Sequence, residues 1–250
     1  MAIKVMCQNV MCWEHKELGR YEDRRPLMKK AVLEHGADVI GFQEVKPIWK
    51  EFFDVDLDGF DSMVVYRSES RKEGTPIYWN PQRLEKRDSG YFWLSETPQV
   101  ESLGWGANCP RITCWILFLD KQSQKEFVLV NTHLDHQSED ARVNGIKQIS
   151  DFIKSKFSNE MPLVLMGDFN ATPNSETIKT ANSILTDCRQ AVGITEFEPT
   201  YHGFEKQANL VIDYIYINDN VKCRDFEMIK EINGKTVQSD HYGLIATIEI

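Results

Sequence analysis

Short apolar runs recur along the whole chain and alternate with a few segments of helical periodicity. Runs of four to eight residues favour β-strands, and their alternation with helices favours an α/β sheet protein. About nine strands are expected, which is more than one sheet usually holds. They are Ile3–Val10, Asp38–Val45, Asp61–Arg67, Thr75–Asn80, Arg111–Asp120, Glu126–Asp135, Leu163–Met166, Leu210–Asn218 and Leu244–Ile250.

Two segments combine helical periodicity with a start or stop signal. The first follows Ser138, a good N-cap residue, and repeats apolar side chains every three or four positions from Val143 to Phe157. The second covers about Asp23–His35 and stops at Gly36. No low-complexity linker, change of composition or long repeat divides the chain, so we expect one domain over residues 1–250.

Composition narrows the classes of partner. The chain has 250 residues, with 29 Lys and Arg against 38 Asp and Glu, which gives a formal net charge of −9. The protein as a whole therefore does not attract nucleic acid or anionic lipid, and no basic stripe predicts binding of an extended duplex. The longest apolar runs are strand-length, far short of a membrane-spanning helix.

Cysteine usage and the N-terminus predict the compartment. The six cysteines form no Cys-x-x-Cys pair, and several lie in apolar, strand-like sequence. This pattern is typical of reduced packing residues rather than of a disulfide framework. The N-terminus opens directly on strand-like sequence without a signal-peptide pattern, so we expect a cytoplasmic protein.

Several predicted strands end in polar residues on their core-facing side. Side chains two positions apart share a face of a strand, so an apolar stripe that ends in a carboxylate or amide carries that group inward. Each such residue alone is typical of a turn or of a hydrogen-bonded buried group. Together they favour one polar pocket, because buried charges need partners or a metal. The residues are Asn9, Glu44, Asn131, His133, Asp168 and Asp213.

Two loops carry further candidate chemistry. Gly167-Asp168-Phe169-Asn170 follows an apolar strand directly, so a proton acceptor and an amide donor sit on one tight turn. Ser239-Asp240-His241 precedes the last strand and pairs a carboxylate that can ligate a metal with an imidazole that can face phosphate. Either segment alone could be an ordinary turn or loop.

Seven ordered blocks resemble the endonuclease/exonuclease/phosphatase superfamily of metal-dependent phosphohydrolases. They span essentially the whole chain, and residues 92–98 and 131–136 are most similar to a bacterial branch near the deadenylases. The resemblance implies a four-layer sandwich, in which two mixed β-sheets pack face to face with helices outside. The blocks are Gln8-Asn9, Gln43-Glu44, Lys72-Glu73-Gly74, Asn131-Thr132-His133, Gly167-Asp168-Phe169-Asn170, Ile212-Asp213-Tyr214 and Ser239-Asp240-His241.

The resemblance also implies a metal site. Glu44 would be the principal ligand, helped by Asn9 and Asp240. Mg²⁺ suits hard oxygen ligands of this kind, and Mn²⁺ could substitute. His133 would contact phosphate or assist the leaving group, with Glu73 as a partner that fixes its tautomer.

The catalytic roles follow from the same resemblance. Asp168 would orient and deprotonate the attacking water, and Asn170 would hold water or a phosphate oxygen. His241, oriented by Asp213, would stabilise the negatively charged transition state. The expected activity is therefore hydrolysis of phosphoester bonds, as a phosphodiesterase or a phosphatase.

The substrate is less well defined by the sequence. An aromatic and basic stretch runs between predicted strands and contains Trp93 and Arg111. It could form a base-stacking or sugar-binding platform in which Arg111 grips phosphate, or its aromatic residues could simply pack in the core. The acidic balance favours a phosphorylated small molecule or short nucleic acid, such as a nucleotide or an oligonucleotide end.

Two other functions remain open at this point. One is a catalytically silent module on the same fold that binds a phosphorylated ligand. The other is a lipid phosphodiesterase of the sphingomyelinase type, which would need an exposed apolar segment to reach a bilayer. Trp49 and Phe52-Phe53 could form such a segment, or they could pack a short helix over Pro47–Asp54.

Overall fold

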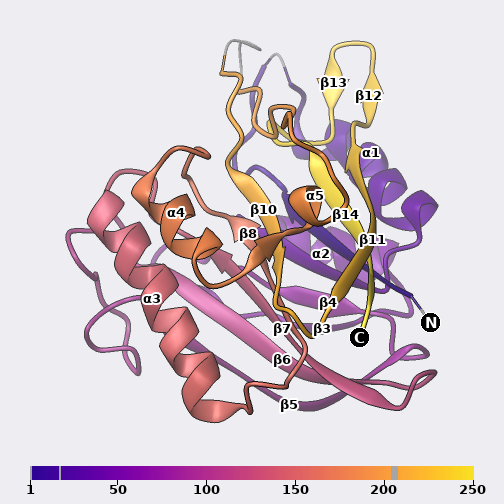
Figure 1. Cartoon of the computed structure of the whole chain (residues 1–250). Coiled ribbons are helices and arrows are strands. Elements are labelled where there is room, and N and C mark those ends of the chain that lie inside the picture. Colours follow the sequence, from indigo (N-terminus) through magenta and orange to yellow (C-terminus); the bar gives the residue numbers. More distant parts are fainter. Residues whose placement is uncertain (1, 17, 204–207) are drawn as a thin grey trace.

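Two mixed six-stranded β-sheets form the centre of the computed structural model, which describes residues 2–16, 18–203 and 208–250 (Figure 1). The first sheet has the order β11 (Lys222–Ile229), β14 (Gly243–Glu249), β1 (Ile3–Asn9), β2 (Val39–Gln43), β4 (Ile77–Trp79) and β3 (Asp61–Met63). The second has the order β5 (Leu84–Trp93), β6 (Ile112–Asp120), β7 (Lys125–His133), β8 (Leu163–Asp168), β10 (Asp213–Ile217) and β9 (Thr186–Asp187). A small hairpin of β12 (Ile232–Asn233) and β13 (Thr236–Val237) stands apart.

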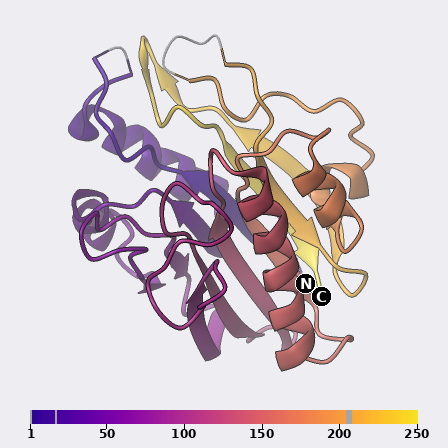
Figure 2. The same ribbon diagram turned by 90° about the vertical axis from the view of Figure 1, so that its left-hand side faces the viewer.

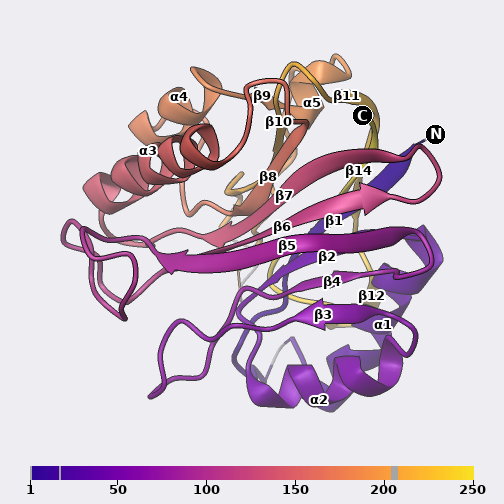
Figure 3. The same cartoon turned by 90° about the horizontal axis from the view of Figure 1, so that it is seen from below.

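Helices cover the outer faces of both sheets. Figure 3 shows α1 (Tyr21–His35) and α2 (Pro47–Asp56) on one side of the paired sheets, and α3 (Glu139–Lys156) and α4 (Glu176–Asn182) on the opposite side. Figure 2 looks onto α3, which lies across the second sheet. A short helix, α5 (Cys188–Ala191), contacts β10 and β11. These layers confirm the expected four-layer sandwich.

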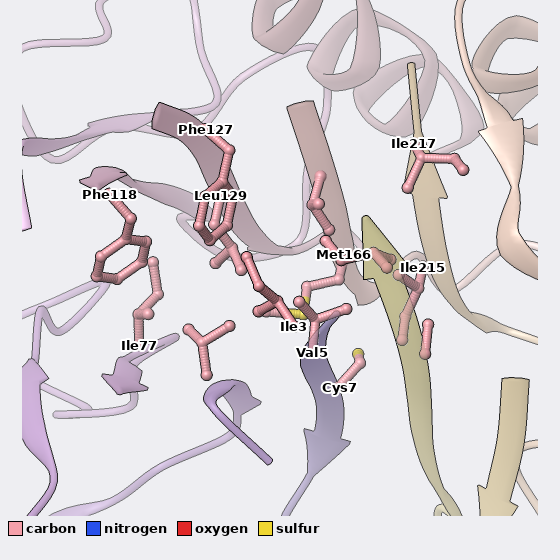
Figure 4. Close-up of a cluster of buried hydrophobic side chains, with 14 of the residues drawn as sticks. Ile3, Val5, Cys7, Ile77, Phe118, Phe127, Leu129, Met166, Ile215 and Ile217 are labelled. Atoms are coloured by element: carbon pink, nitrogen blue, oxygen red, sulfur yellow. The ribbon is translucent and has the colours of Figure 1, made fainter. Parts of the chain in front are cut away.

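Apolar side chains from the two sheets fill the space between them (Figure 4). Ile3, Val5 and Cys7 of β1 meet Met166 of β8 and Ile215 of β10, and all five are buried. The alternation of strand side chains explains the arrangement, because every second residue of each strand faces this layer.

Each outer layer has a core of its own. Trp49 and Phe53 of α2 pack with Phe42 of the first sheet and are at most 3% exposed. Trp49 and Phe53 are therefore packing residues of a short helix, which is the second of the two interpretations left open for this segment. In the described part of the chain, no helix is long and apolar enough to cross a membrane.

The strand predictions were wrong mainly at sheet edges. The Asp61–Arg67 strand ends at Met63, and β10 is shorter than the predicted Leu210–Asn218. Strands β5 and β11 were missed, because edge strands carry charged residues that hide the apolar period. The aromatic stretch expected between strands begins inside β5, where Trp93 pairs with Ile112.

A buried amide network joins the two sheets below their polar end. Asn131 of β7 accepts a hydrogen bond from Gln43 Nε2 at 2.7 Å, and its own amide donates to the carbonyls of Phe42, Thr75 and Pro76. Gly41 allows this approach, because a Cβ there would lie 2.7 Å from Asn131 Cγ. The network fixes how the ends of β2 and β7 face each other.

Removing this amide should destabilise the protein. In Asn131→Ala the Gln43 amide and three buried carbonyls lose a partner, so we expect the free energy of unfolding to fall by about 3 kcal/mol. Chemical denaturation measures the change. Asn174→Ala, at an exposed position, is the matched control. Equal stability of the two variants would contradict the bridging role of Asn131.

Candidate active site

The polar strand ends meet at one end of the sheet pair. His133 of β7 is in register with Asp168 of β8, and Asp168 is in register with Asp213 of β10. Asn9 of β1 and Gln43 of β2 end the neighbouring strands of the first sheet. A cleft of about 510 Å³ opens at this end, and Glu44, His133, Asp168, Asn170, Asp240 and His241 all line it.

Local backbone geometry explains the Gly-Asp-Phe-Asn turn. Gly167 has a φ of 154°, and a Cβ there would lie 2.0 Å from the carbonyl oxygen of Thr132, so only glycine fits. Asn170 has a φ of 48°, in the left-handed region that asparagine tolerates. The turn closes when Asp168 Oδ1 accepts the backbone N–H of Asn170 at 2.9 Å.

Asp168 is the central carboxylate of the cleft. Its Oδ2 lies 3.0 Å from Asn9 Nδ2, 3.4 Å from His133 Nε2 and 3.8 Å from His241 Nε2. Burial and the nearby charge of Asp213 raise the pKa of Asp168 to about 7. A carboxylate with a pKa near neutrality can both accept and release a proton, as a general base must.

His241 is held as a cation by a chain of buried partners. Its Nδ1 lies 2.9 Å from Asp213 Oδ2, and the same oxygen accepts the hydroxyl of Thr200 at 2.6 Å. Burial alone would lower the pKa of His241, but Asp213 and the other carboxylates raise it well above its ordinary value. With Nδ1–H directed at Asp213, the Nε2–H faces the cleft.

His133 is the neutral imidazole of the site. Asn170 Nδ2 donates to the carbonyl of Leu134 and to His133 Nε2, both at 3.1 Å, so Nε2 carries no proton. Burial, together with the positive charge of Arg111, lowers the pKa of His133 well below its ordinary value. The expected partner Glu73 is instead engaged by Arg67 at 2.7 Å, so Asn170 replaces it in this role.

Glu44 follows β2 in a left-handed conformation, with a φ of 64°. This costs free energy for a non-glycine residue, and two hydrogen bonds to its carboxylate offset the cost. Asn9 Nδ2 donates to Oε1 at 3.1 Å, and the backbone N–H of Cys12 donates to Oε2 at 2.8 Å. Burial would raise the pKa of Glu44, but the hydrogen bonds from Cys12 and Asn9 lower it.

The oxygen donors of the cleft fit a hard divalent cation. Glu44, His133 and Asp168 each offer a ligand atom, and these atoms lie within 4.8 Å of one another. Asp240 is buried in the same cleft, and its pKa is raised by burial and by the charge of Glu44. Carboxylates that repel one another in this way are stabilised by a bound cation, and carboxylate oxygens suit Mg²⁺ or Mn²⁺.

Asn9 has a different place from the one expected of a metal ligand. Its amide oxygen accepts the backbone N–H of Met11 at 2.9 Å, which directs the NH₂ group at both Glu44 and Asp168. Asn9 therefore bridges the two carboxylates as a hydrogen-bond donor, while its amide oxygen accepts the backbone N–H of Met11. The residue type alone does not fix this arrangement, because an amide can present either atom.

A buried arginine that the sequence analysis missed supports this loop. The Arg24 guanidinium donates to the carbonyls of Val10, Met11 and Trp13 at 2.9 to 3.1 Å. It thereby holds the segment whose Cys12 N–H reaches Glu44. Arg24 lies on the buried, otherwise apolar face of α1. A charged residue at such a position was the signal in the sequence that could have indicated a buried structural role.

The remaining expected substrate contacts divide. Arg111 and Glu73 line the cleft together with Arg67 and Arg71, which were not singled out from the sequence. Trp93 is not part of that lining. It packs against the core between the sheets, and its indole N–H donates to the carbonyl of Arg67 at 3.0 Å. Packing, rather than a stacking platform, accounts for this side chain.

Comparison with known proteins agrees with this fold. Residues 25–241 match the Endonuclease/Exonuclease/phosphatase family, so the chain belongs to this family. An uncharacterised protein of Acanthamoeba polyphaga mimivirus is 28% identical over 99% of this chain and 100% of its own.

Solved structures share the whole architecture. A Bacteroides vulgatus endonuclease/exonuclease/phosphatase superposes with a TM-score of 0.92 at 28% identity, over 100% of this chain and 99% of that one. A mannosyl-6-phosphatase of Bacteroides thetaiotaomicron has a TM-score of 0.87 at 24% identity, over 99% and 100%, which shows the common fold.

The charge state of His241 should depend on Asp213. In Asp213→Asn the carboxylate that raises the imidazole pKa is lost, while burial still lowers it, so the pKa of His241 should fall. NMR titration of the imidazole in metal-free buffer measures this change. The exposed Asp219→Asn variant is the control. An unchanged His241 pKa in Asp213→Asn would refute the pairing.

Proposed function

We propose that the protein is a Mg²⁺-dependent hydrolase of phosphoester bonds that acts, as one catalytic domain, on a small or short phosphorylated substrate. The observation that carries this proposal is the meeting of Asp168, His241 and Glu44 in one cleft. Attack on a phosphoester needs a base, a positive group that stabilises developing charge, and a metal ion. A carboxylate with a pKa near 7, a cationic imidazole and a set of hard oxygen ligands supply these three elements.

Asp168 acts as the general base. The Asn9 amide donates to Oδ2 and the backbone N–H of Asn170 donates to Oδ1, so its carboxylate is held in one orientation. Its pKa of about 7 leaves a substantial ionised fraction at neutral pH, which can take a proton from the attacking water. Asn170, on the same turn, orients that water or a phosphoryl oxygen.

His241 stabilises the charge that develops on phosphorus-bound oxygens. Asp213 keeps the imidazole protonated and fixes Nε2–H toward the cleft, where it donates to a phosphoryl oxygen. The donor is in place before the substrate arrives, so no reorganisation is needed in the transition state. His133, which lines the same cleft beside Asp168, would contact the phosphate or assist the leaving group.

Glu44 and Asp240 would hold the metal ion, and Asn9 would position the Glu44 carboxylate. When bound, Mg²⁺ supplies a Lewis acid that neutralises phosphoryl charge. The metal-binding carboxylate must be held in one orientation, and the hydrogen bonds from Asn9 and Cys12 hold that of Glu44.

A nucleotide or an oligonucleotide end matches the volume and the charge of the site. The cleft of about 510 Å³ is in the range of small-molecule sites. The net charge of −9 argues against extended duplex binding, since phosphate attraction must come from residues of the cleft itself.

Replacing Asp168 or His241 should lower turnover strongly. In Mg²⁺, we expect Asp168→Asn and His241→Ala each to lower the rate of p-nitrophenyl phosphate and bis(p-nitrophenyl) phosphate hydrolysis by about 10²- to 10⁴-fold, with the fold retained. Asp219→Asn, on the surface, should keep the wild-type rate. Unchanged turnover in both site variants would remove the assigned chemistry, and binding of phosphate compounds without product would favour a silent module.

The metal site can be tested separately from turnover. Mn²⁺ titration followed by electron paramagnetic resonance should give a dissociation constant at least about tenfold higher for Glu44→Gln than for wild type, because a charged ligand is lost. Glu51→Gln changes an exposed glutamate and serves as the matched control. Equal Mn²⁺ affinity of the two variants would place the ion elsewhere.

A further inference from the structure

We propose that Arg111, Arg67 and Arg71 form a second anion-binding subsite, which selects phosphoesters that carry a second phosphate group. The inference rests on the proposed hydrolysis for the identity of the scissile group, but the subsite itself is argued from the cleft. All three arginines are among the residues that line the cleft containing Asp168 and His241.

Arg111 is the principal evidence. The residue is 5% exposed, yet its Nε and Nη1 have no hydrogen-bond partner within the described chain. Its Nη2 lies 3.2 Å from His136 Nδ1, which leaves two donors of a buried guanidinium unmatched. Buried unmatched donors cost free energy, and an anion in the cleft would remove that cost with charge-assisted hydrogen bonds.

The acidic residue nearest Arg111 does not saturate it. Asp135 lies 3.8 Å from Arg111 Nε, which is too far for a hydrogen bond. Its carboxylate instead accepts the backbone N–H groups of Asn108, Gln137 and Ser138 at 2.9 to 3.0 Å. Asp135 therefore anchors the loop and forms only a long ion pair with Arg111, without a hydrogen bond.

Arg67 and Arg71 extend the positive surface. Arg67 pairs with Glu73, but its Nε also lacks a hydrogen-bond partner among the residues the structure describes. Arg71 is exposed on a tight loop that is closed when its backbone N–H donates to Ser68 Oγ. The three arginines carry one formal positive charge more than Glu73 and Asp135, the carboxylates that lie beside Arg67 and Arg111.

The neighbouring imidazole of His136 contacts Arg111 directly. Burial and the charge of Arg111 lower the pKa of His136, which accordingly accepts from Arg111 as a neutral ring. An anion here thus meets guanidinium donors that do not depend on histidine protonation. Arginine suits the role, because its planar donors match phosphate oxygens in pairs.

Strand register sets the spacing between the two subsites. Arg111 immediately precedes β6, and β7 separates β6 from β8, where Asp168 lies. Two strand spacings place the backbones of Arg111 and Asp168 about 10 Å apart. A compound whose two phosphates are joined through one sugar can reach both subsites. This predicts nucleoside bisphosphates, sugar bisphosphates or oligonucleotide ends as the substrate class.

Binding to a protein that cannot turn over provides the test. Calorimetry in Mg²⁺, in an Asp168→Asn background, would compare 5′-AMP with adenosine 3′,5′-bisphosphate and glucose 6-phosphate with glucose 1,6-bisphosphate. We expect at least one bisphosphate to bind about tenfold more tightly than its monophosphate partner, because charge-assisted hydrogen bonds are added. The pair with the larger ratio identifies a nucleotide or a sugar scaffold.

Second-site substitutions then assign the ratio to the arginines. Arg71→Gln and Arg111→Gln should each reduce it about tenfold, and the exposed position of Arg71 keeps the test valid if Arg111→Gln fails to fold. Lys72→Gln, which removes an adjacent exposed charge, should leave it unchanged. A ratio near one, or one that no folded arginine variant alters, would overturn the subsite.

Turnover is scored independently with the wild-type protein and p-nitrophenyl phosphate. Absence of hydrolysis together with an arginine-dependent ratio would refute the proposed function and support the subsite. Hydrolysis without an arginine-dependent ratio would support the proposed function and refute the subsite.

Discussion

Buried negative charge is the constraint on which the rest of the site depends. Asp168, Asp213 and Asp240 lie inside one end of the sheet pair, where unpaired carboxylates would be costly. Their compensation is specific: the His241 cation engages one oxygen of Asp213, and the Asn9 amide and the backbone N–H of Asn170 engage the two oxygens of Asp168. Charges held in this way cannot rearrange freely, and the repulsion that remains among the carboxylates is the physical reason that a divalent cation would bind.

The two sheets contribute different halves of this arrangement, so their relative placement matters as much as the residues. The hydrogen bond from Gln43 to Asn131 crosses between the sheets directly below the cleft. It sets Glu44, which follows Gln43, against His133, which follows Asn131 by two positions on the same strand face. Arg24 secures the adjoining loop on the first sheet. The catalytic geometry is thus an extension of buried polar packing.

Electrostatics divides the cleft along its length. The acidic residues Glu44, Asp168 and Asp240 and the His241 imidazole come from the residue after β2, from β8 and from the segment before β14, whereas the arginines come from the segment between β3 and β4 and from the residue before β6. An overall charge of −9 disfavours polyanions at long range, while local arginines favour a small anion that enters the cleft. Attraction at short range and repulsion at long range together favour a compact phosphorylated ligand.

The sequence by itself determined the polar strand ends, the central strands, the main helices and the family, because apolar periodicity and ordered motifs are local properties of the chain. Edge strands β5 and β11 were not predicted, because their charged residues obscure the alternation of apolar and polar positions. Only the tertiary structure decided that Asn9 donates to Glu44 and Asp168, that Arg67 pairs with Glu73, and that Trp93 packs against the core. Those outcomes depend on which partner lies within about 3 Å, and that distance is set by the packing of two sheets whose strands are far apart in sequence.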